Sequence, residues 1–123
     1  MADALLIVED DDDIRTNLVE ILTHNGYRTA PVTNGAEAMA YLKIHPPPRL
    51  ILLDLMMPVM DGWEVMHALV ANAALAHVPV IVLSGAGDLM QEVQLLGAVA
   101  CIGKPFNVGA LLDAIERYAL PAA

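Results

Sequence analysis

The stretch RLILLD, residues 49–54, has four consecutive apolar residues and ends in a carboxylate. A strand that is apolar on both faces is typical of the middle of a parallel sheet, because helices cover both sides of such a sheet. We therefore expect an α/β fold in which Asp54 stands at the carboxyl end of a central strand.

Further apolar runs, and the helical patterns between them, extend this prediction along the chain. We expect additional strands over residues 4–8, 27–32, 78–84 and 99–103. Helices are expected from Asp11 or Asp12 to about Gly26, from a capping box of Asn34 and Glu37 to about Ile44, over 62–75, over 88–96, and after Asn107. Regular alternation of strands and helices predicts a parallel sheet with helices on both faces.

The composition is that of one acidic globular domain. With 123 residues the chain is long enough for a single core, and we expect residues 1–123 to form one domain. The formal net charge of −9 argues against nucleic acid and anionic membranes as partners, because both attract basic surfaces. One cysteine, Cys101, and the absence of a recognisable signal peptide favour a cytoplasmic location.

One stretch imitates a membrane span. Residues 65–87 contain no Asp, Glu, Lys or Arg and are long enough to cross a bilayer. Polar residues and a proline interrupt the stretch, namely His67, Asn72, His77 and Pro79. We therefore interpret it as a helix, a turn and a buried strand.

Polar side chains follow the predicted strands at one end. Glu9 and Asp10 follow the first strand, Asp54 ends the third, Ser84 ends the fourth and Lys104 follows the fifth. Because ligands of open α/β sheets bind at the carboxyl ends of the strands, we expect these side chains to meet at one rim. Carboxylates, a backbone carbonyl and water suit a hard cation such as Mg²⁺. A carboxylate beside a cation, an ammonium and a hydroxyl is equipped to accept a phosphoryl group.

The acidic run EDDDD, residues 9–13, has a second interpretation. Asp11–Asp13 fit the cap and first turn of a helix, whose dipole favours anions by about 0.3–1 kcal/mol each, and the whole run could serve only this purpose. A Mg²⁺-dependent phosphatase with an aspartate nucleophile is a further reading. Such enzymes typically carry a second Asp two residues later, where this chain has Met56.

Four motifs, LLIVEDD…R, LILLDLMMPVMDG, VIVLSG and GKPF, occur in this order. In order and spacing they resemble the receiver domain of two-component response regulators, of the chemotaxis-regulator type. The resemblance implies a flavodoxin-like doubly wound sheet of five parallel strands in the order 2-1-3-4-5, with five helices. It implies a signalling domain that accepts a phosphoryl group and assists its own phosphorylation and dephosphorylation, rather than an enzyme. The donor would be a phosphohistidine of a sensor histidine kinase or of a histidine phosphotransfer protein.

The resemblance also implies a role for each acidic residue of the rim. The phosphoacceptor of the family is the aspartate that ends the third strand, which here is Asp54. Asp10 and Asp54 would bind Mg²⁺ directly, together with the backbone carbonyl of Met56. Glu9 would act mostly through water.

The remaining rim residues follow the family in part. Ser84 would bond a phosphoryl oxygen and shift on phosphorylation, Lys104 would pair with the phosphoryl group, and the Lys104–Pro105 bond would be cis. The chain departs from the family at Cys101, where an aromatic residue usually swings inward as the hydroxyl residue moves. A thiol is too small to fill that space, and the stretch before Lys104 is slightly shorter than usual. An alternative function is therefore a receiver-fold scaffold or interaction module whose output depends weakly on phosphorylation.

Overall fold

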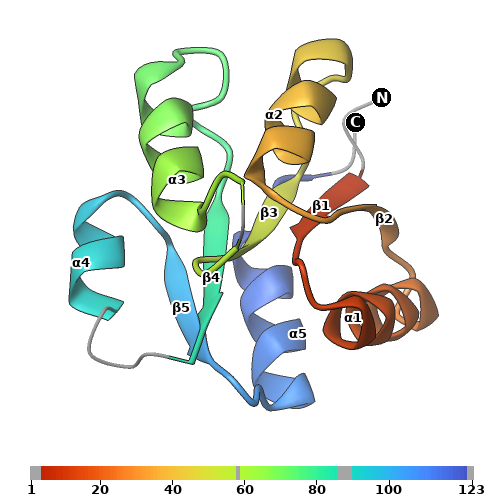
Figure 1. The fold of residues 1–123 in the computed structure, drawn as a ribbon. Helices are drawn as coiled ribbons and strands as arrows, with labels where there is room; N and C mark the ends of the chain where they lie inside the picture. The colour runs from red at the N-terminus through yellow and green to blue at the C-terminus, as the bar shows by residue number, and fades with distance from the viewer. Residues whose placement is uncertain (1–3, 58, 86–89, 122–123) are drawn as a thin grey trace.

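The computed structural model describes residues 4–57, 59–85 and 90–121. Its strands are β1 (Ala4–Val8), β2 (Arg28–Val32), β3 (Leu50–Asp54), β4 (Val80–Ser84) and β5 (Ala100–Gly103). Neighbouring strands pair in parallel, in the order β2-β1-β3-β4-β5 (Figure 1). The predicted sheet topology is confirmed, and β3 occupies the centre with every residue buried.

Helices cover both faces of the sheet. Those of the described residues are α1 (Asp12–His24), α2 (Gly35–Ile44), α3 (Gly62–Ala71), α4 (Met90–Leu95) and α5 (Val108–Tyr118). One core cluster joins α1 and α5 to the sheet, and a second joins α2 and α3 to the opposite face (Figure 1). Of the helix predicted over 88–96, only the part from Met90 can be compared, because residues 86–89 lie outside the described residues.

The helix starts follow the predicted caps with one difference. The carboxylate of Asp11 accepts from the main-chain N–H of Asp13 at 2.9 Å, and the side chain of Asn34 accepts from that of Glu37 at 2.9 Å. Glu37 was expected to reach back to the Asn34 N–H, but its carboxylate accepts instead from the N–H of Thr33 at 2.8 Å. The Glu37 carboxylate therefore accepts from an N–H one residue earlier than predicted. The Asn34 side chain still satisfies the N–H of Glu37 in the first turn of α2.

Helix α3 ends at Ala71, whereas the sequence predicted a helix to about Leu75. The cause is Asn72, whose side chain accepts from the N–H of Ala74 at 3.0 Å and offers the backbone an alternative to the helix. The main-chain oxygen of Asn72 then accepts from the N–H groups of Leu75 and Ala76, which forms a compact turn before β4.

The loop between β3 and α3 is held tightly beneath Asp54. The N–H of Gly62 donates to the oxygen of Leu55 at 2.9 Å. Asp61 and Glu64 form a reciprocal capping box at the start of α3. A Cβ atom added to Gly62 would lie 2.5 Å from the main-chain oxygen of Asp54, so only glycine fits this approach.

The start of β1 and the residues that follow α5 lie at the amino edge of the sheet, opposite to the rim formed by the carboxyl ends of the strands (Figure 1). Arg49 forms hydrogen bonds to both segments. Its main-chain N–H donates to the oxygen of Ala4 at 2.9 Å, and its side-chain Nε donates to the oxygen of Leu120 at 2.6 Å. Among the described residues, no helix has the length and apolar character needed to cross a bilayer. The interpretation of residues 65–87 as a helix, a turn and a strand therefore stands for the residues that are described.

We predict that Gly62→Ala destabilises the protein by about 1–3 kcal/mol, because the new methyl group collides with main-chain atoms that cannot move without displacing Asp54. Urea denaturation followed by circular dichroism measures the change. Gly85→Ala is the matched control, because a Cβ atom there meets nothing within 4 Å. Equal free energies of unfolding for the two variants would contradict the prediction.

Candidate functional site

Three carboxylates meet at the carboxyl rim of the sheet. Strands β1 and β3 pair with Val8 opposite Leu53, so the residues that follow, Glu9 and Asp54, are neighbours. Together with Asp10, each offers one oxygen, and these oxygens lie within 4.8 Å of one another. Glu9 and Asp54 are buried, with exposed fractions of 1% and 5%, whereas Asp10 is exposed. The rim predicted from the strand ends therefore exists.

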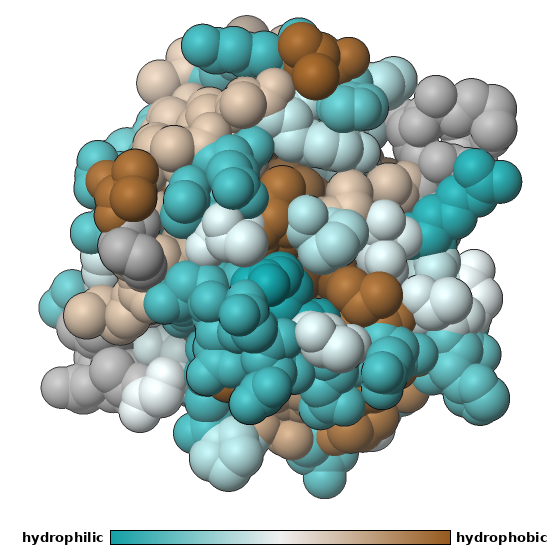
Figure 2. Space-filling view, turned by 45° about the vertical axis from the view of Figure 1, so that its right-hand side comes forward, coloured by the Kyte–Doolittle hydropathy of each residue, from teal (hydrophilic) through white to brown (hydrophobic). Residues whose placement is uncertain are grey.

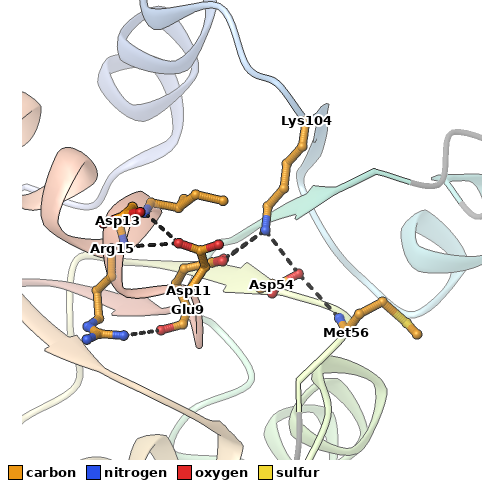
Figure 3. Close-up of polar contacts among 8 residues, drawn as sticks. Glu9, Asp11, Asp13, Arg15, Asp54, Met56 and Lys104 are labelled. Atoms are coloured by element: carbon orange, nitrogen blue, oxygen red, sulfur yellow. Dashed lines mark hydrogen bonds and ion pairs between the residues drawn. The ribbon is translucent and has the colours of Figure 1, made fainter.

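Lys104 supplies a positive charge to this cluster. Its Nζ lies 3.0 Å from both carboxylate oxygens of Glu9 and 3.4 Å from Oδ1 of Asp54 (Figure 3). The main-chain N–H of Lys104 donates to the oxygen of Ser84 at 2.9 Å, and the Lys104–Pro105 bond is cis, as the sequence predicts. The ammonium thus bridges two buried carboxylates.

Burial and charge shift the protonation of the two central groups. Burial raises the pKa of Asp54 to about 7, and the charge of Glu9 adds to the rise, while the ammonium of Lys104 opposes it. Burial alone would lower the pKa of Lys104, but its hydrogen bond to Glu9 and the charges of both carboxylates hold that pKa above its ordinary value. The lysine therefore stays charged, whereas Asp54 titrates near neutral pH.

The carboxylate spacing and donor set fit a hard cation. Oxygen ligands lie about 2.1 Å from Mg²⁺, so two ligands on opposite sides of the ion are about 4.2 Å apart. Ligands at adjacent positions of an octahedral ion are about 3.0 Å apart, so the three carboxylate oxygens, which lie within 4.8 Å of one another, would have to draw closer around a bound ion. All three donors are carboxylate oxygens, the ligand type that Mg²⁺ favours. Glu9, Asp10 and Asp54 thus form a cluster that could hold such an ion.

Met56 and Ser84 border the cluster. The N–H of Met56 donates to Oδ1 of Asp54 at 3.3 Å, while its side chain is 68% exposed. Ser84 is buried at the end of β4. Side chains alternate along a strand, and Val80 and Val82 face the α2–α3 core, so Ser84 continues that row. Asp54 continues the opposite row, so the two residues connect the rim to different faces of the sheet.

Cys101, the position of the expected aromatic residue, lies in β5 opposite Val82. It is half-buried and packs against the core formed with α2 and α3, on the same face as Ser84. Burial raises the pKa of its thiol, which suppresses the thiolate. Cys101 is therefore a small, partly buried residue of this core rather than a reactive thiol.

The sequence analysis missed two features of the rim. Arg15 donates from Nη1 to the main-chain oxygen of Glu9 at 3.0 Å, although the motif LLIVEDD…R already contained this residue. Val59, in the loop after Asp54, has φ 70° and is 80% exposed. Positive φ is strained for a β-branched residue, and no sequence pattern predicts which loop residue adopts it.

The acidic run forms one side of the rim. Asp10–Asp13 are all exposed, and α1 begins among them. Hydrophilic residues gather in the lower middle of Figure 2, the view that brings α1 forward. Asp11 caps α1 and Asp12 and Asp13 lie in its first turn, so the helix-start interpretation holds for these three, while Glu9 and Asp10 join the carboxylate cluster.

Comparison with known proteins agrees with this geometry. The chain is 33% identical to the sporulation initiation phosphotransferase F of Bacillus subtilis over 96% of this chain and 94% of that protein. It is also 33% identical to the transcriptional regulatory protein PdtaR of Mycobacterium tuberculosis, but spans only 54% of that longer protein. The receiver domain of a histidine kinase from Syntrophus aciditrophicus superposes with a TM-score of 0.86 at 35% identity, covering 95% of this chain and 89% of that one.

The family profile of the response regulator receiver domain matches residues 5–116, nearly the whole chain. The matched region contains every residue of the carboxylate cluster and Lys104. The chain therefore belongs to the receiver-domain family of two-component response regulators.

Proposed function

We propose that Asp54 accepts a phosphoryl group from a phosphohistidine in a Mg²⁺-dependent reaction, and that this switches the contacts of the domain with other proteins. The observation that carries the proposal is the position of Asp54: it is buried between two carboxylates and within 3.4 Å of a lysine ammonium. A nucleophile placed beside a cation site and an ammonium suits phosphoryl transfer.

The transfer follows from the geometry of these groups. A carboxylate oxygen of Asp54 attacks phosphorus, the bond between phosphorus and the donor imidazole breaks, and its electron pair goes to the imidazole nitrogen, which takes a proton from solvent. Mg²⁺, when bound by Asp10, Asp54 and the Met56 carbonyl, would offset charge on the phosphoryl oxygens. Lys104 pairs with the same oxygens, and Ser84 donates to one of them.

The wider context is part of the same proposal. Residues 1–123 act as one receiver domain in the cytoplasm, and the phosphoryl donor is a histidine kinase or a histidine phosphotransfer protein. One of the chain's relatives is itself a sensor histidine kinase, TmoS of Ectopseudomonas mendocina, 38% identical over 75% of this chain. The domain is a signalling module that assists its own phosphorylation and dephosphorylation rather than an enzyme with an external substrate.

A second function, an interaction module with weak dependence on phosphorylation, is favoured by Cys101. This residue lies on the sheet face that Ser84 also adjoins. A thiol there has far less volume than an aromatic ring. A movement of Ser84 would therefore displace no large side chain of β5. Under this alternative, phosphorylation changes the rim and leaves the outer part of β5 and α4 as they were.

Incubation with Mg²⁺ and a small acyl phosphate is expected to add one phosphoryl group to the wild-type protein, because the site itself supplies the catalytic groups. Intact-mass spectrometry detects the addition. Asp54→Asn should gain nothing, whereas Asp113→Asn, which removes an exposed carboxylate on α5, should be labelled like the wild type. Equal labelling of Asp54→Asn, or none of the wild type, would refute the proposed function.

The pKa of Asp54 predicts how stability depends on pH without metal. A folded-state pKa of about 7, against 3.8 for the free side chain, means that ionisation of Asp54 costs stability as the pH rises from about 4 to above 7. Asp54→Asn removes this cost. In EDTA at pH 8 the variant should be more stable than the wild type by about 1–3 kcal/mol, and the difference should shrink towards pH 4.

Urea denaturation in EDTA at several pH values measures this difference. Asp113→Asn controls for the loss of one negative charge at an exposed site. Adding Mg²⁺ at pH 8 should stabilise the wild type and not Asp54→Asn. If the difference between wild type and Asp54→Asn does not change with pH, burial and the charge of Glu9 do not act on Asp54 as described.

Beryllofluoride with Mg²⁺, a mimic of the bound phosphoryl group, separates the two candidate functions. If Ser84 drives a switch through β5, amide NMR shifts should extend from the rim to Cys101 and into α4. If the interaction-module alternative holds, shifts should stay within residues that adjoin Asp54, because the small thiol of Cys101 does not move together with Ser84 as an aromatic side chain would. Asp54→Asn, treated in the same way, supplies the baseline.

A further inference from the structure

Arg15 is a second cation at the rim, and it contacts the main chain rather than a carboxylate of the cluster. Its Nη1 donates to the main-chain oxygen of Glu9 at 3.0 Å (Figure 3). Its Nη2 pairs with the carboxylate of Asp12. The side chain is only 18% exposed, although it lies at the start of a surface helix. The planar fork of the guanidinium makes both contacts at once, which a lysine ammonium does less well.

The oxygen that Arg15 holds belongs to the residue at which β1 ends. The N–H of Glu9 donates to the oxygen of Val32 at 3.2 Å, so the sheet fixes the amino side of this residue. The carboxylate of Glu9 is fixed by Lys104 at 3.0 Å. The bond from Arg15 fixes the remaining part, the peptide plane that joins Glu9 to Asp10 and from which the chain enters the turn before α1.

We propose that Arg15 is a positioning residue of the divalent-cation site: through the main-chain oxygen of Glu9 it orients the Glu9–Asp10 peptide, and so places the Asp10 carboxylate relative to Asp54. This inference rests on the proposed function, because it concerns the same cation site. Partners outside the ligand shell commonly orient the ligands, and their removal weakens metal binding by about 10–100-fold.

Because Arg15 is positively charged, the direction in which its removal changes Mg²⁺ affinity tests this role. A positive charge near the site repels Mg²⁺, so an effect of charge alone requires that Arg15→Gln binds Mg²⁺ more tightly than the wild type. Loss of orientation requires weaker binding. The two accounts therefore predict opposite changes for one substitution.

Isothermal titration of Mg²⁺ into the metal-free protein measures the affinity directly. Arg15→Gln should bind Mg²⁺ about tenfold more weakly than the wild type. Arg15→Lys, which keeps the charge but not the fork, should fall between the two. Asp12→Asn removes the ion pair and one negative charge but leaves the bond to Glu9 in place, so its affinity should fall by less than that of Arg15→Gln. Lys43→Gln removes the same charge as Arg15→Gln at the exposed end of α2 and is the matched control.

The outcomes distinguish a failure of the proposed function from a failure of the role proposed for Arg15. Wild-type protein that binds no Mg²⁺ refutes the proposed function and this inference with it. Wild-type binding together with equal or tighter binding by Arg15→Gln refutes only the role of Arg15. A loss in Asp12→Asn as large as in Arg15→Gln would assign the effect to the start of α1 and also overturns the inference. Thermal denaturation in EDTA establishes a temperature at which all variants are folded, and the titrations are made there.

Discussion

The structure depends on keeping three carboxylates together at the end of a buried sheet. Two unit charges 4.8 Å apart repel by about 3–4 kcal/mol at an effective dielectric constant near 20. At 3.0 and 3.4 Å from two of the carboxylates, the Lys104 ammonium supplies attraction of a similar size, but it does not remove the cost of burying the charges of Glu9 and Asp54. Burial raises the pKa of Asp54 to about 7 and the charge of Glu9 adds to the rise, so protonation of Asp54 relieves part of this cost. A divalent cation removes the same cost without a proton, so the cluster gains stability from the ion that it is suited to bind.

Most of this arrangement could be predicted because it follows from strand ends. Buried strands such as β3 are apolar over their whole length, so their bounds are clear in the sequence, and parallel pairing then brings their carboxyl ends to one rim. Glu9, Asp54 and Lys104 were placed together by this rule alone. The strand order came from the family resemblance, because the pattern of apolar runs does not say which strands are neighbours.

What could not be predicted depends on the direction of single side chains. The end of α3 at Ala71 depends on whether Asn72 bonds its own turn or faces solvent. The contact from Arg15 to Glu9 depends on a long side chain folding back over six residues, and Asp12 was an equally plausible sole partner. The family resemblance assigned Lys104 to a phosphoryl group, and the strand ends placed it near Glu9 and Asp54 without predicting that its ammonium contacts both carboxylates.

The two cations of the rim differ in a way that matches their contacts. Lys104 places a single charged atom on a flexible stem between two carboxylates, at 3.0 and 3.4 Å, so a small rotation brings it closer to either one. Arg15 holds a main-chain oxygen with a rigid fork and is itself held by Asp12. A group that must follow new charge on Asp54 needs the first arrangement, and a group that must keep a peptide plane still needs the second. The rim therefore combines a point charge on a flexible stem with a planar fork, each acting on a different part of the same residue, Glu9.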